Sequence, residues 1–244
     1  MHDHDPPIRT AGHASWLIAL ALVAWLGASL AAWYGVTAFG FTGEHVAEGE
    51  TPTVWPKDSA IIPSKTRPTL LLFLHPKCAC SQATVEELER LSTLAPTGTP
   101  PAIRVVASTP RSTGKLWESS PLLRSTGRLP NASVFPDTGG VEAARFGARV
   151  SGTVLLYDAD GRRLYAGGVT MARGHDGHNA GIQAVADLLQ NPRAQVTAIP
   201  AFGCKVVREV AASADGSGDA KGSKSEVIGI APAESTPAVE GDAQ

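Results

Sequence analysis

The stretch Thr69-Leu-Leu-Leu-Phe-Leu-His-Pro-Lys-Cys-Ala-Cys-Ser81 decides the fold, because it joins an apolar run to two closely spaced cysteines. The run Thr69–Leu74 predicts a buried strand, and the apolar spacing after Ser81 predicts a helix. A helix N-terminus carries unpaired N–H groups and about half a positive charge, which together stabilise a thiolate. Lys77 adds a positive charge beside the first cysteine. The segment therefore supplies a nucleophile, a second thiol and a field that favours ionisation.

Cys78 and Cys80 are open to three interpretations. They can carry out thiol–disulfide exchange, which is the leading hypothesis. They can also ligate a soft metal such as copper(I), with His75 as a third donor. Finally, they can be inert residues at the end of a strand, although adjacent cysteines in a polar turn are poor candidates for filling a core.

The composition excludes several classes of protein. The 244 residues leave room for one domain of ordinary size with extensions. The formal net charge is −2 and no basic block occurs, so no nucleic-acid partner is indicated. Three cysteines are too few for a scaffold held together by disulfides.

The N-terminal part predicts a membrane anchor over residues 14–41. No charged residue occurs from Ala14 to Gly43, and about 20 apolar residues span a bilayer. Trp16 and the pair Trp33-Tyr34 suit the two interfacial belts. Arg9 precedes the span, so we expect residues 1–13 in the cytoplasm and the rest of this single-pass protein outside it, on the periplasmic side in a bacterium.

A cleaved signal peptide is the alternative for this stretch. Ser29-Leu30-Ala31 would be its cleavage site, but the apolar core is longer than the about 7 to 15 residues typical of such peptides. Either interpretation places the cysteines outside the cytoplasm, where disulfides persist.

The remaining chain divides into a proline-rich spacer at 42–67, a domain at 68–208 and a low-complexity tail at 209–244, which we expect to be disordered. Alternating patterns predict strands at Thr69–Leu74, Ala102–Ser108, Ala132–Phe135, Thr153–Tyr157 and Arg163–Ala166. Helical patterns lie at Ser81–Ala95, Lys115–Thr126 and Val141–Phe146, with a last helix capped by Asn179 and ended before Pro192. This order favours an α/β fold, a mixed sheet with helices on both faces.

The domain resembles the thioredoxin-like superfamily, and within it the membrane-anchored RedB-type group close to the TlpA and ResA thiol–disulfide oxidoreductases. The resemblance covers about residues 68–206. It rests on Phe-Leu-His-Pro-Lys-Cys-Ala-Cys (73–80), Ser-Gly-Thr-Val-Leu-Leu-Tyr-Asp-Ala-Asp-Gly (151–161), Gly-Gly-Val-Thr (167–170) with Arg-Gly-His-Asp-Gly-His-Asn-Ala-Gly (173–181), and Phe-Gly-Cys (202–204). It implies an exported, membrane-tethered enzyme that acts on protein thiols or disulfides without a cofactor.

Two departures from the family pattern bear on activity. A thioredoxin has Cys-x-x-Cys, but this chain has Cys78-Ala-Cys80, with Ser81 where the second cysteine would fall. The family also has a cis-proline facing the disulfide, whereas this chain has Gly152 before Thr153. These changes leave the fold prediction intact and keep open a catalytically degenerate scaffold.

The resemblance also brings a distant loop to the cysteines. In a thioredoxin-like core, the strand after Asp-Ala-Asp-Gly161 is parallel to Thr69–Leu74, so the loop 167–179 emerges at the same edge of the sheet. Its His175 and His178 can tune a thiol, or they can be polar loop residues. They can also complete a soft-metal site with the two cysteines and His75, and the copper ligands expected in that case are Cys78, Cys80, His75 and His175.

The resemblance implies that Cys78 forms the mixed disulfide and that Cys80 resolves it. A Cys-x-Cys disulfide closes a small, strained ring, and strain raises the reduction potential, so we expect an oxidant or isomerase. Chain length allows Cys204 to return to this edge, where it would be a resolving thiol, a metal ligand or a packing residue. Lys77, His75, His175, His178 and Cys204 are auxiliary candidates.

Overall fold

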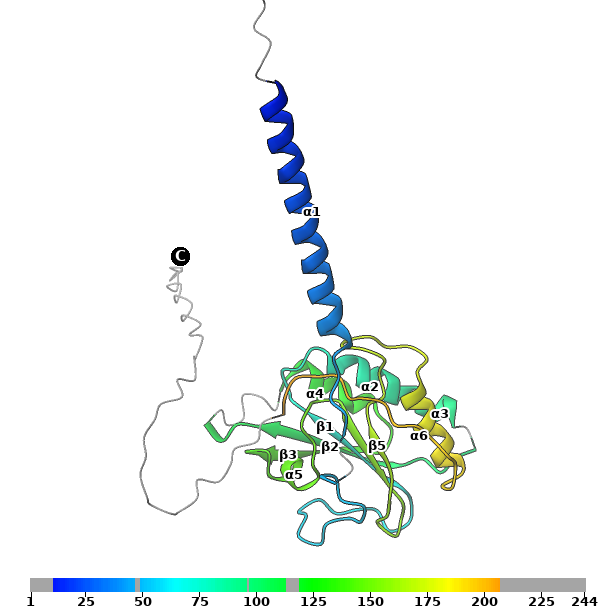
Figure 1. The fold of residues 1–244 in the computed structure, drawn as a ribbon. Coiled ribbons are helices and arrows are strands. Elements are labelled where there is room, and N and C mark those ends of the chain that lie inside the picture. Colours follow the sequence, from blue (N-terminus) through cyan, green and yellow to red (C-terminus); the bar gives the residue numbers. More distant parts are fainter. Residues whose placement is uncertain (1–10, 47–48, 96, 113–118, 207–244) are drawn as a thin grey trace, which may run out of the picture. The chain divides into compact units, whose positions relative to one another are not determined.

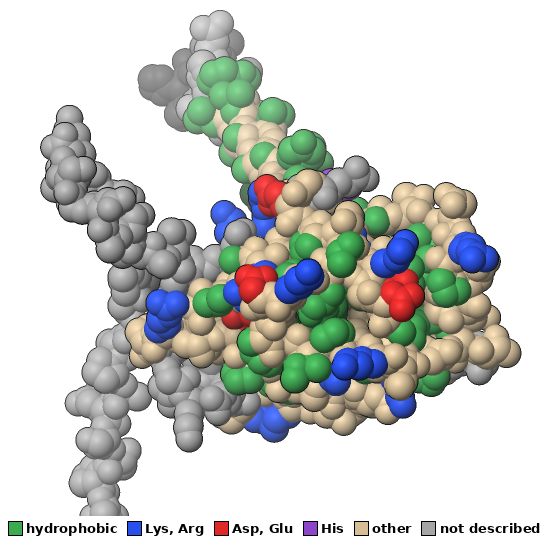
Figure 2. Space-filling view, turned by 90° about the horizontal axis from the view of Figure 1, so that it is seen from below, with side chains coloured by type: hydrophobic (Ala, Val, Ile, Leu, Met, Phe, Trp, Pro, Cys, Tyr) green, Lys and Arg blue, Asp and Glu red, His purple; other side chains and the backbone are tan. Residues whose placement is uncertain are grey.

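The computed structural model describes residues 11–46, 49–95, 97–112 and 119–206 (Figure 1). The predictions for the first ten residues and for the tail at 209–244 lie outside these ranges. Helix α1 spans Ala11–Phe41, and its stretch Ser15–Phe41 has a mean hydropathy of 1.9 in its most apolar part. The apolar side chains of this stretch are exposed, as the green surface of the helix in Figure 2 shows. By length and composition, α1 is able to cross a membrane.

One five-stranded sheet forms the centre of the domain, with strand order β3-β2-β1-β4-β5. The strands are β1 (Thr69–Leu74), β2 (Ala102–Thr109), β3 (Ala132–Thr138), β4 (Thr153–Tyr157) and β5 (Arg163–Gly167). Strands β1, β2 and β3 are mutually parallel, whereas β4 is antiparallel to both β1 and β5. Strand β5 therefore runs parallel to β1, and the loops that follow these two strands leave the same edge of the sheet.

Both faces of the sheet are covered, and every residue of the central strand β1 is therefore buried. Alternate residues of β1 enter two separate clusters: Leu70, Leu72 and Leu74 face one side, and Leu71 and Phe73 face the other. The first side is covered by α2 (Ser81–Glu89), α3 (Leu91–Leu94), α4 (Pro121–Ser125) and α6 (Ala180–Gln190), and the second by α5 (Val141–Arg145) (Figure 1). The predicted thioredoxin-like α/β arrangement is confirmed.

Several element boundaries differ from the predictions. The helix expected over Ser81–Ala95 is divided at Arg90, whose N–H bonds to the carbonyl of Glu87 in a tighter turn. Within the described residues, the weak helix expected at 115–126 is reduced to α4 and a 3₁₀ turn at Thr126–Arg128. Strand β3 continues past its predicted end through Pro136, which is tolerated because β3 is an edge strand.

The last helix forms as its sequence predicts. The side chain of Asn179 accepts hydrogen bonds from the N–H groups of Gly181 and Ile182, both at 3.0 Å. These bonds satisfy two of the unpaired donors at the start of α6. Its predicted inward residues are all buried: Ile182, Val185, Leu188 and Leu189.

The segment 42–67 is more than the expected spacer, since part of it packs on the second face of the sheet. The Trp55 ring lies 5.1 Å from that of Phe146 and 5.0 Å from that of Tyr157, and Ile61 is buried in the same cluster. Helix α5 has only five residues, so it covers this face incompletely. Apolar residues of the segment 42–67, Trp55 and Ile61, cover the rest of this face of the sheet.

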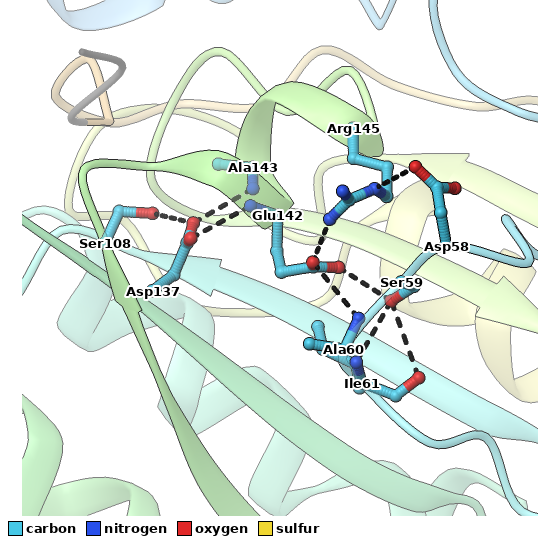
Figure 3. Close-up of polar contacts among 9 residues, drawn as sticks. All are labelled: Asp58, Ser59, Ala60, Ile61, Ser108, Asp137, Glu142, Ala143 and Arg145. Atoms are coloured by element: carbon cyan, nitrogen blue, oxygen red, sulfur yellow. Dashed lines mark hydrogen bonds and ion pairs between the residues drawn. The ribbon is translucent and has the colours of Figure 1, made fainter. Parts of the chain in front are cut away.

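A network of buried carboxylates fixes that segment to α5 (Figure 3). Glu142 accepts hydrogen bonds from the Ser59 hydroxyl (2.6 Å) and the Ala60 N–H (3.2 Å), and it pairs with Arg145. Asp137 accepts the N–H groups of Glu142 and Ala143, both at 2.9 Å, and so satisfies donors at the start of α5. The two carboxylates therefore have structural partners.

The charges on the surface are mixed. On the face shown in Figure 2, Lys and Arg side chains are scattered, with Asp and Glu beside several of them and hydrophobic side chains between. This distribution agrees with the absence of a basic block in the sequence.

Candidate active site

The chain turns from β1 into α2 at the paired cysteines. The Cys78 N–H donates to the His75 carbonyl (2.8 Å), and the Ser81 N–H lies 3.2 Å from the Cys78 carbonyl. Cys80 is the N-cap residue of α2, which begins at Ser81. All three cysteines are free thiols; Cys78 is fully buried, Cys80 is half-buried and Cys204 is exposed. The predicted placement of the cysteines between a strand and a helix is confirmed.

The third cysteine returns to this site. The N–H of Cys204 donates a hydrogen bond to the sulfur of Cys78 at 3.2 Å, across 126 positions of sequence. The Cys204 thiol also lowers the pKa of Cys78, and the Cys78 thiol raises that of Cys204. Chain length alone only allowed this return, and the structure shows it.

Ser151 holds the three segments of the site together. Its hydroxyl accepts a hydrogen bond from the His75 N–H (2.9 Å) and shares another with the Ser81 hydroxyl (2.7 Å). Its own N–H donates to the Cys204 carbonyl (2.8 Å). Sequence reasoning missed Ser151, although its place directly before Gly152 marks it as a neighbour of the position that is proline in the thioredoxin pattern.

Gly152 allows the chain to pass close to α2. Its φ is +89°, and a Cβ atom here would lie 3.0 Å from the Thr84 hydroxyl oxygen. Its N–H donates to the Phe73 carbonyl (2.8 Å), which keeps this turn against β1. The described residues contain no cis peptide bond.

The pKa values of Cys78 and Cys204 are shifted in opposite directions. Burial opposes ionisation of Cys78, but donors from the Ser81 hydroxyl, from the backbone and thiol of Cys204, and from the Ser81 N–H outweigh it and lower the pKa of Cys78. Partial burial, followed by the hydrogen bond and negative charge of Cys78, raises the pKa of Cys204 to about 11, although Arg173 acts in the opposite direction. As the pH rises, Cys78 therefore ionises before Cys204.

The auxiliary residues of the cysteine loop are His75 and Lys77. His75 is half-buried, and its Nδ1 accepts a hydrogen bond from the Lys77 N–H (3.3 Å). Burial lowers the pKa of His75, and the charge of Lys77 acts in the same direction, so the imidazole stays neutral at neutral pH. The ring is thus turned toward its own loop, and the Lys77 side chain is exposed.

The loop after β5 reaches the site through Arg173. The Arg173 guanidinium donates to the Gly203 carbonyl (2.6 Å), next to Cys204. His175 and His178 are both exposed, and the Nδ1 of His175 bonds to the Arg173 carbonyl (2.9 Å). Arg173 was not among the candidates predicted from the sequence, because its contact is with a backbone carbonyl and leaves no signal in residue type.

Helix α2 fixes this loop in place. The buried carboxylate of Glu87 accepts the Gly177 N–H and pairs with Arg90 (3.0 Å), which also pairs with Asp176 (3.0 Å). In the part of the chain that the structure describes, no group of three or more His, Cys, Asp or Glu side chains is arranged to hold a metal ion. The proposed copper ligands Cys78, Cys80, His75 and His175 are therefore not brought together as a set.

Comparisons with known proteins extend the description of the fold. No protein-family model matches the chain, and no curated protein matches it. A hypothetical protein from Sinorhizobium meliloti is 16% identical, with a TM-score of 0.50 over 66% of this chain and 96% of that one. An uncharacterized conserved protein from Geobacillus kaustophilus is 18% identical, with a TM-score of 0.50 over 70% and 95%.

A secreted disulfide oxidoreductase from Mycobacterium tuberculosis also matches, at 20% identity and a TM-score of 0.32 over 48% of this chain and 84% of that one. At these identities, the first two structures show the shared fold and nothing of function. The topology described above is that of a thioredoxin-like fold, with the paired cysteines between β1 and α2.

Proposed function

We propose that this chain is a membrane-tethered thiol–disulfide oxidoreductase whose central sulfur is that of Cys78. One observation carries the proposal: the buried Cys78 sulfur accepts a hydrogen bond from the Cys204 N–H at 3.2 Å, which brings the residue of a second thiol beside it, and Ser81 and Cys204 together lower the pKa of Cys78. Thiol–disulfide exchange needs a stabilised thiolate and a partner sulfur within reach. Both are present at the edge of the sheet where ligand sites of open α/β folds occur.

The direction of exchange follows from the stabilised thiolate. Donors that lower the pKa of Cys78 stabilise the reduced protein relative to its disulfide, and this raises the reduction potential. We therefore propose an oxidant of protein dithiols. Its reaction transfers two electrons from a substrate dithiol to the protein disulfide and needs no cofactor.

The setting of the reaction is the extracytoplasmic side of a membrane. Helix α1 supplies the tether, and the oxidising compartment outside the cytoplasm allows a disulfide to persist. The substrates are then protein thiols exposed on that side, which in a bacterium is the periplasm.

A redox titration of the full chain in detergent micelles tests the proposal. The protein is equilibrated with graded ratios of reduced and oxidised glutathione and quenched in acid, and its thiols are counted by mass after maleimide labelling. Two thiols should disappear together at one midpoint, and Cys78→Ser should abolish this step while keeping its unfolding transition. If all three thiols persist at every ratio, the chain is not an oxidoreductase of this kind.

A further inference from the structure

We infer that the redox partner of Cys78 is Cys204, and that Cys204 is the sulfur that meets the substrate while Cys78 leaves as the thiolate. This inference rests on the proposed function and departs from the Cys78–Cys80 pair that the sequence suggests.

The backbone turns Cys80 away from Cys78. Successive i to i+3 bonds from the Ser81 and Gln82 N–H groups, both 3.2 Å, wind this stretch into a helical turn, and Cys80 has α-helical φ and ψ. Side chains two positions apart in a helical turn do not face each other. The Cys80 side chain instead packs partly against the apolar cluster beneath α2.

Cys204 lies within bonding range of Cys78. Because its N–H is 3.2 Å from the Cys78 sulfur, the Cys204 Cα lies within about 4.7 Å of that sulfur. Besides partial burial, the charge of Cys78 raises the pKa of the Cys204 thiol. A Cα this close to the partner sulfur is compatible with an S–S bond between the two residues.

The backbone around Cys204 is held for this contact. The Ser151 N–H binds the Cys204 carbonyl (2.8 Å), and the Val206 N–H binds the Arg149 carbonyl (3.0 Å). Gly203 lies so close to Ser151 that an added Cβ would be 1.9 Å from the Ser151 carbonyl oxygen. This close approach brings the two segments together beside Cys78.

Exposure assigns the two sulfurs their roles. Cys78 is fully buried and Cys204 is exposed, so an incoming thiolate can reach the Cys204 sulfur first. Attack on the Cys204 sulfur releases Cys78 as a thiolate beside the Cys204 N–H, which donates a hydrogen bond to it. A sulfur with a lower pKa also leaves faster.

The exchange proceeds in two balanced steps. A substrate thiolate attacks the Cys204 sulfur of the Cys78–Cys204 disulfide; the bond between substrate and Cys204 forms, and the electron pair of the broken S–S bond goes to Cys78. The second substrate thiolate then attacks the substrate sulfur, forming the substrate disulfide. Cys204 leaves with an electron pair and takes up a proton, because its pKa is high beside the Cys78 anion. The substrate dithiol is oxidised by two electrons, and the protein disulfide is reduced by two.

Tryptic peptides of the oxidised full chain locate the disulfide. Cleavage after Lys77, Arg90, Arg193 and Lys205 leaves both Cys78 and Cys80 in peptide 78–90 and Cys204 in peptide 194–205. Without reducing agent, wild type and Cys80→Ser should both yield the two peptides linked together. The link should be absent from Cys78→Ser and Cys204→Ser, which must keep their unfolding transitions.

A different result separates this inference from the proposed function. A disulfide within peptide 78–90, with Cys204 free, would overturn the Cys204 assignment and leave the oxidoreductase standing. If neither disulfide forms at any glutathione ratio, both fail.

The roles of the two sulfurs are tested by trapping. Oxidised Cys80→Ser is treated with a peptide that carries one thiol, and the products are quenched in acid. The peptide should be attached to Cys204 in fragment 194–205. Attachment to Cys78 would reverse the assigned roles.

Discussion

Cys78 combines full burial with a lowered pKa. Burial alone raises the pKa of a thiol, because it removes water from the charged form. Here the donors from Ser81 and Cys204 replace that water and exceed the cost of burial. The thiolate is thus stabilised by neutral hydrogen-bond donors fixed by the fold.

Replacing Ser81 by Ala should raise the pKa of Cys78. A hydrogen bond to a charged group contributes about 1.5 to 3 kcal/mol, which corresponds to a shift of about one to two pH units. The measurement is the ultraviolet thiolate absorbance against pH, with the curve of Cys78→Ser subtracted. Ser133→Ala, at an exposed position on β3, is the matched control and should leave the midpoint unchanged.

The same shift sets a pH dependence of stability. Because the folded pKa of Cys78 lies below the ordinary value of 9.0, its ionisation stabilises the fold at pH values above 9.0. This contribution is lost as the pH falls through the folded pKa. The loss of unfolding free energy should be smaller in Ser81→Ala, as measured by urea unfolding at pH values from above 9.0 to below the folded pKa of Cys78. An equal loss in both proteins would contradict the role of the Ser81 hydroxyl.

At the scale of single residues, the sequence identified Cys78 through its strand–turn–helix setting. It could not identify Ser151 or Arg173 as partners of the site. The Ser151 N–H donates to the Cys204 carbonyl and the Arg173 side chain to the Gly203 carbonyl, and backbone carbonyls are the same in every residue. Such contacts follow from the path of the chain and have no signal in residue type.

At the scale of elements, strong periodicity predicted strands β1 and β4 and the start of α6 correctly. The segment 201–206 has no such pattern, because it is held by isolated bridges, Ala201 to Glu44 and Lys205 to Val150. Tertiary hydrogen bonds set its position. The part of the site that contains Cys204 was therefore beyond sequence reasoning, apart from the reach of the chain.

Gly203→Ala should separate the two cysteines. The new methyl group would collide with the Ser151 carbonyl, so we expect residues 203–204 to move away from Ser151 and from Cys78. We expect the thiolate pKa of Cys78 to rise and the disulfide to Cys204 to be lost or reduced in yield. Gly127→Ala is the control, since no atom lies within 4 Å of its added Cβ. An unchanged thiolate titration in Gly203→Ala would show that the close approach does not matter.

Trp55→Ala should destabilise the domain by about 2 to 3 kcal/mol, below the full cost of a buried aromatic because Trp55 is half-buried. Its ring packs against Phe146 and Tyr157 on the second face of the sheet. Ile62→Ala, which removes an exposed side chain of the same segment, should change the free energy of unfolding little. Urea unfolding of the two variants measures the difference. Equal stabilities would mean that residues 42–67 are only a spacer.

At the scale of the whole molecule, the proposed role of α1 as an anchor predicts that the cysteines lie outside the cytoplasm. A reporter enzyme that is active only outside the cytoplasm, fused after Gly49, should be active. The intact mass of the purified protein should also include residues 14–41, since an anchor is retained whereas a signal peptide is cleaved. Reporter activity in the cytoplasm would refute the topology. An intact mass that corresponds to a chain starting after Ala31 would show that residues 14–31 belong to a cleaved signal peptide and are not retained as an anchor.

The separation of Cys78 and Cys204 along the chain has a thermodynamic consequence. A disulfide between them would enclose a covalent ring of about 126 residues, containing most of the sheet and helix α6. In the chain-entropy model, closing a ring of this size restricts the unfolded chain by about 4 to 5 kcal/mol, whereas a ring through Cys78 and Cys80 would restrict it very little. Oxidation should therefore raise the melting temperature of the domain and its resistance to proteolysis. Each turnover would then alternate the protein between a more stable oxidised form and a less stable reduced form.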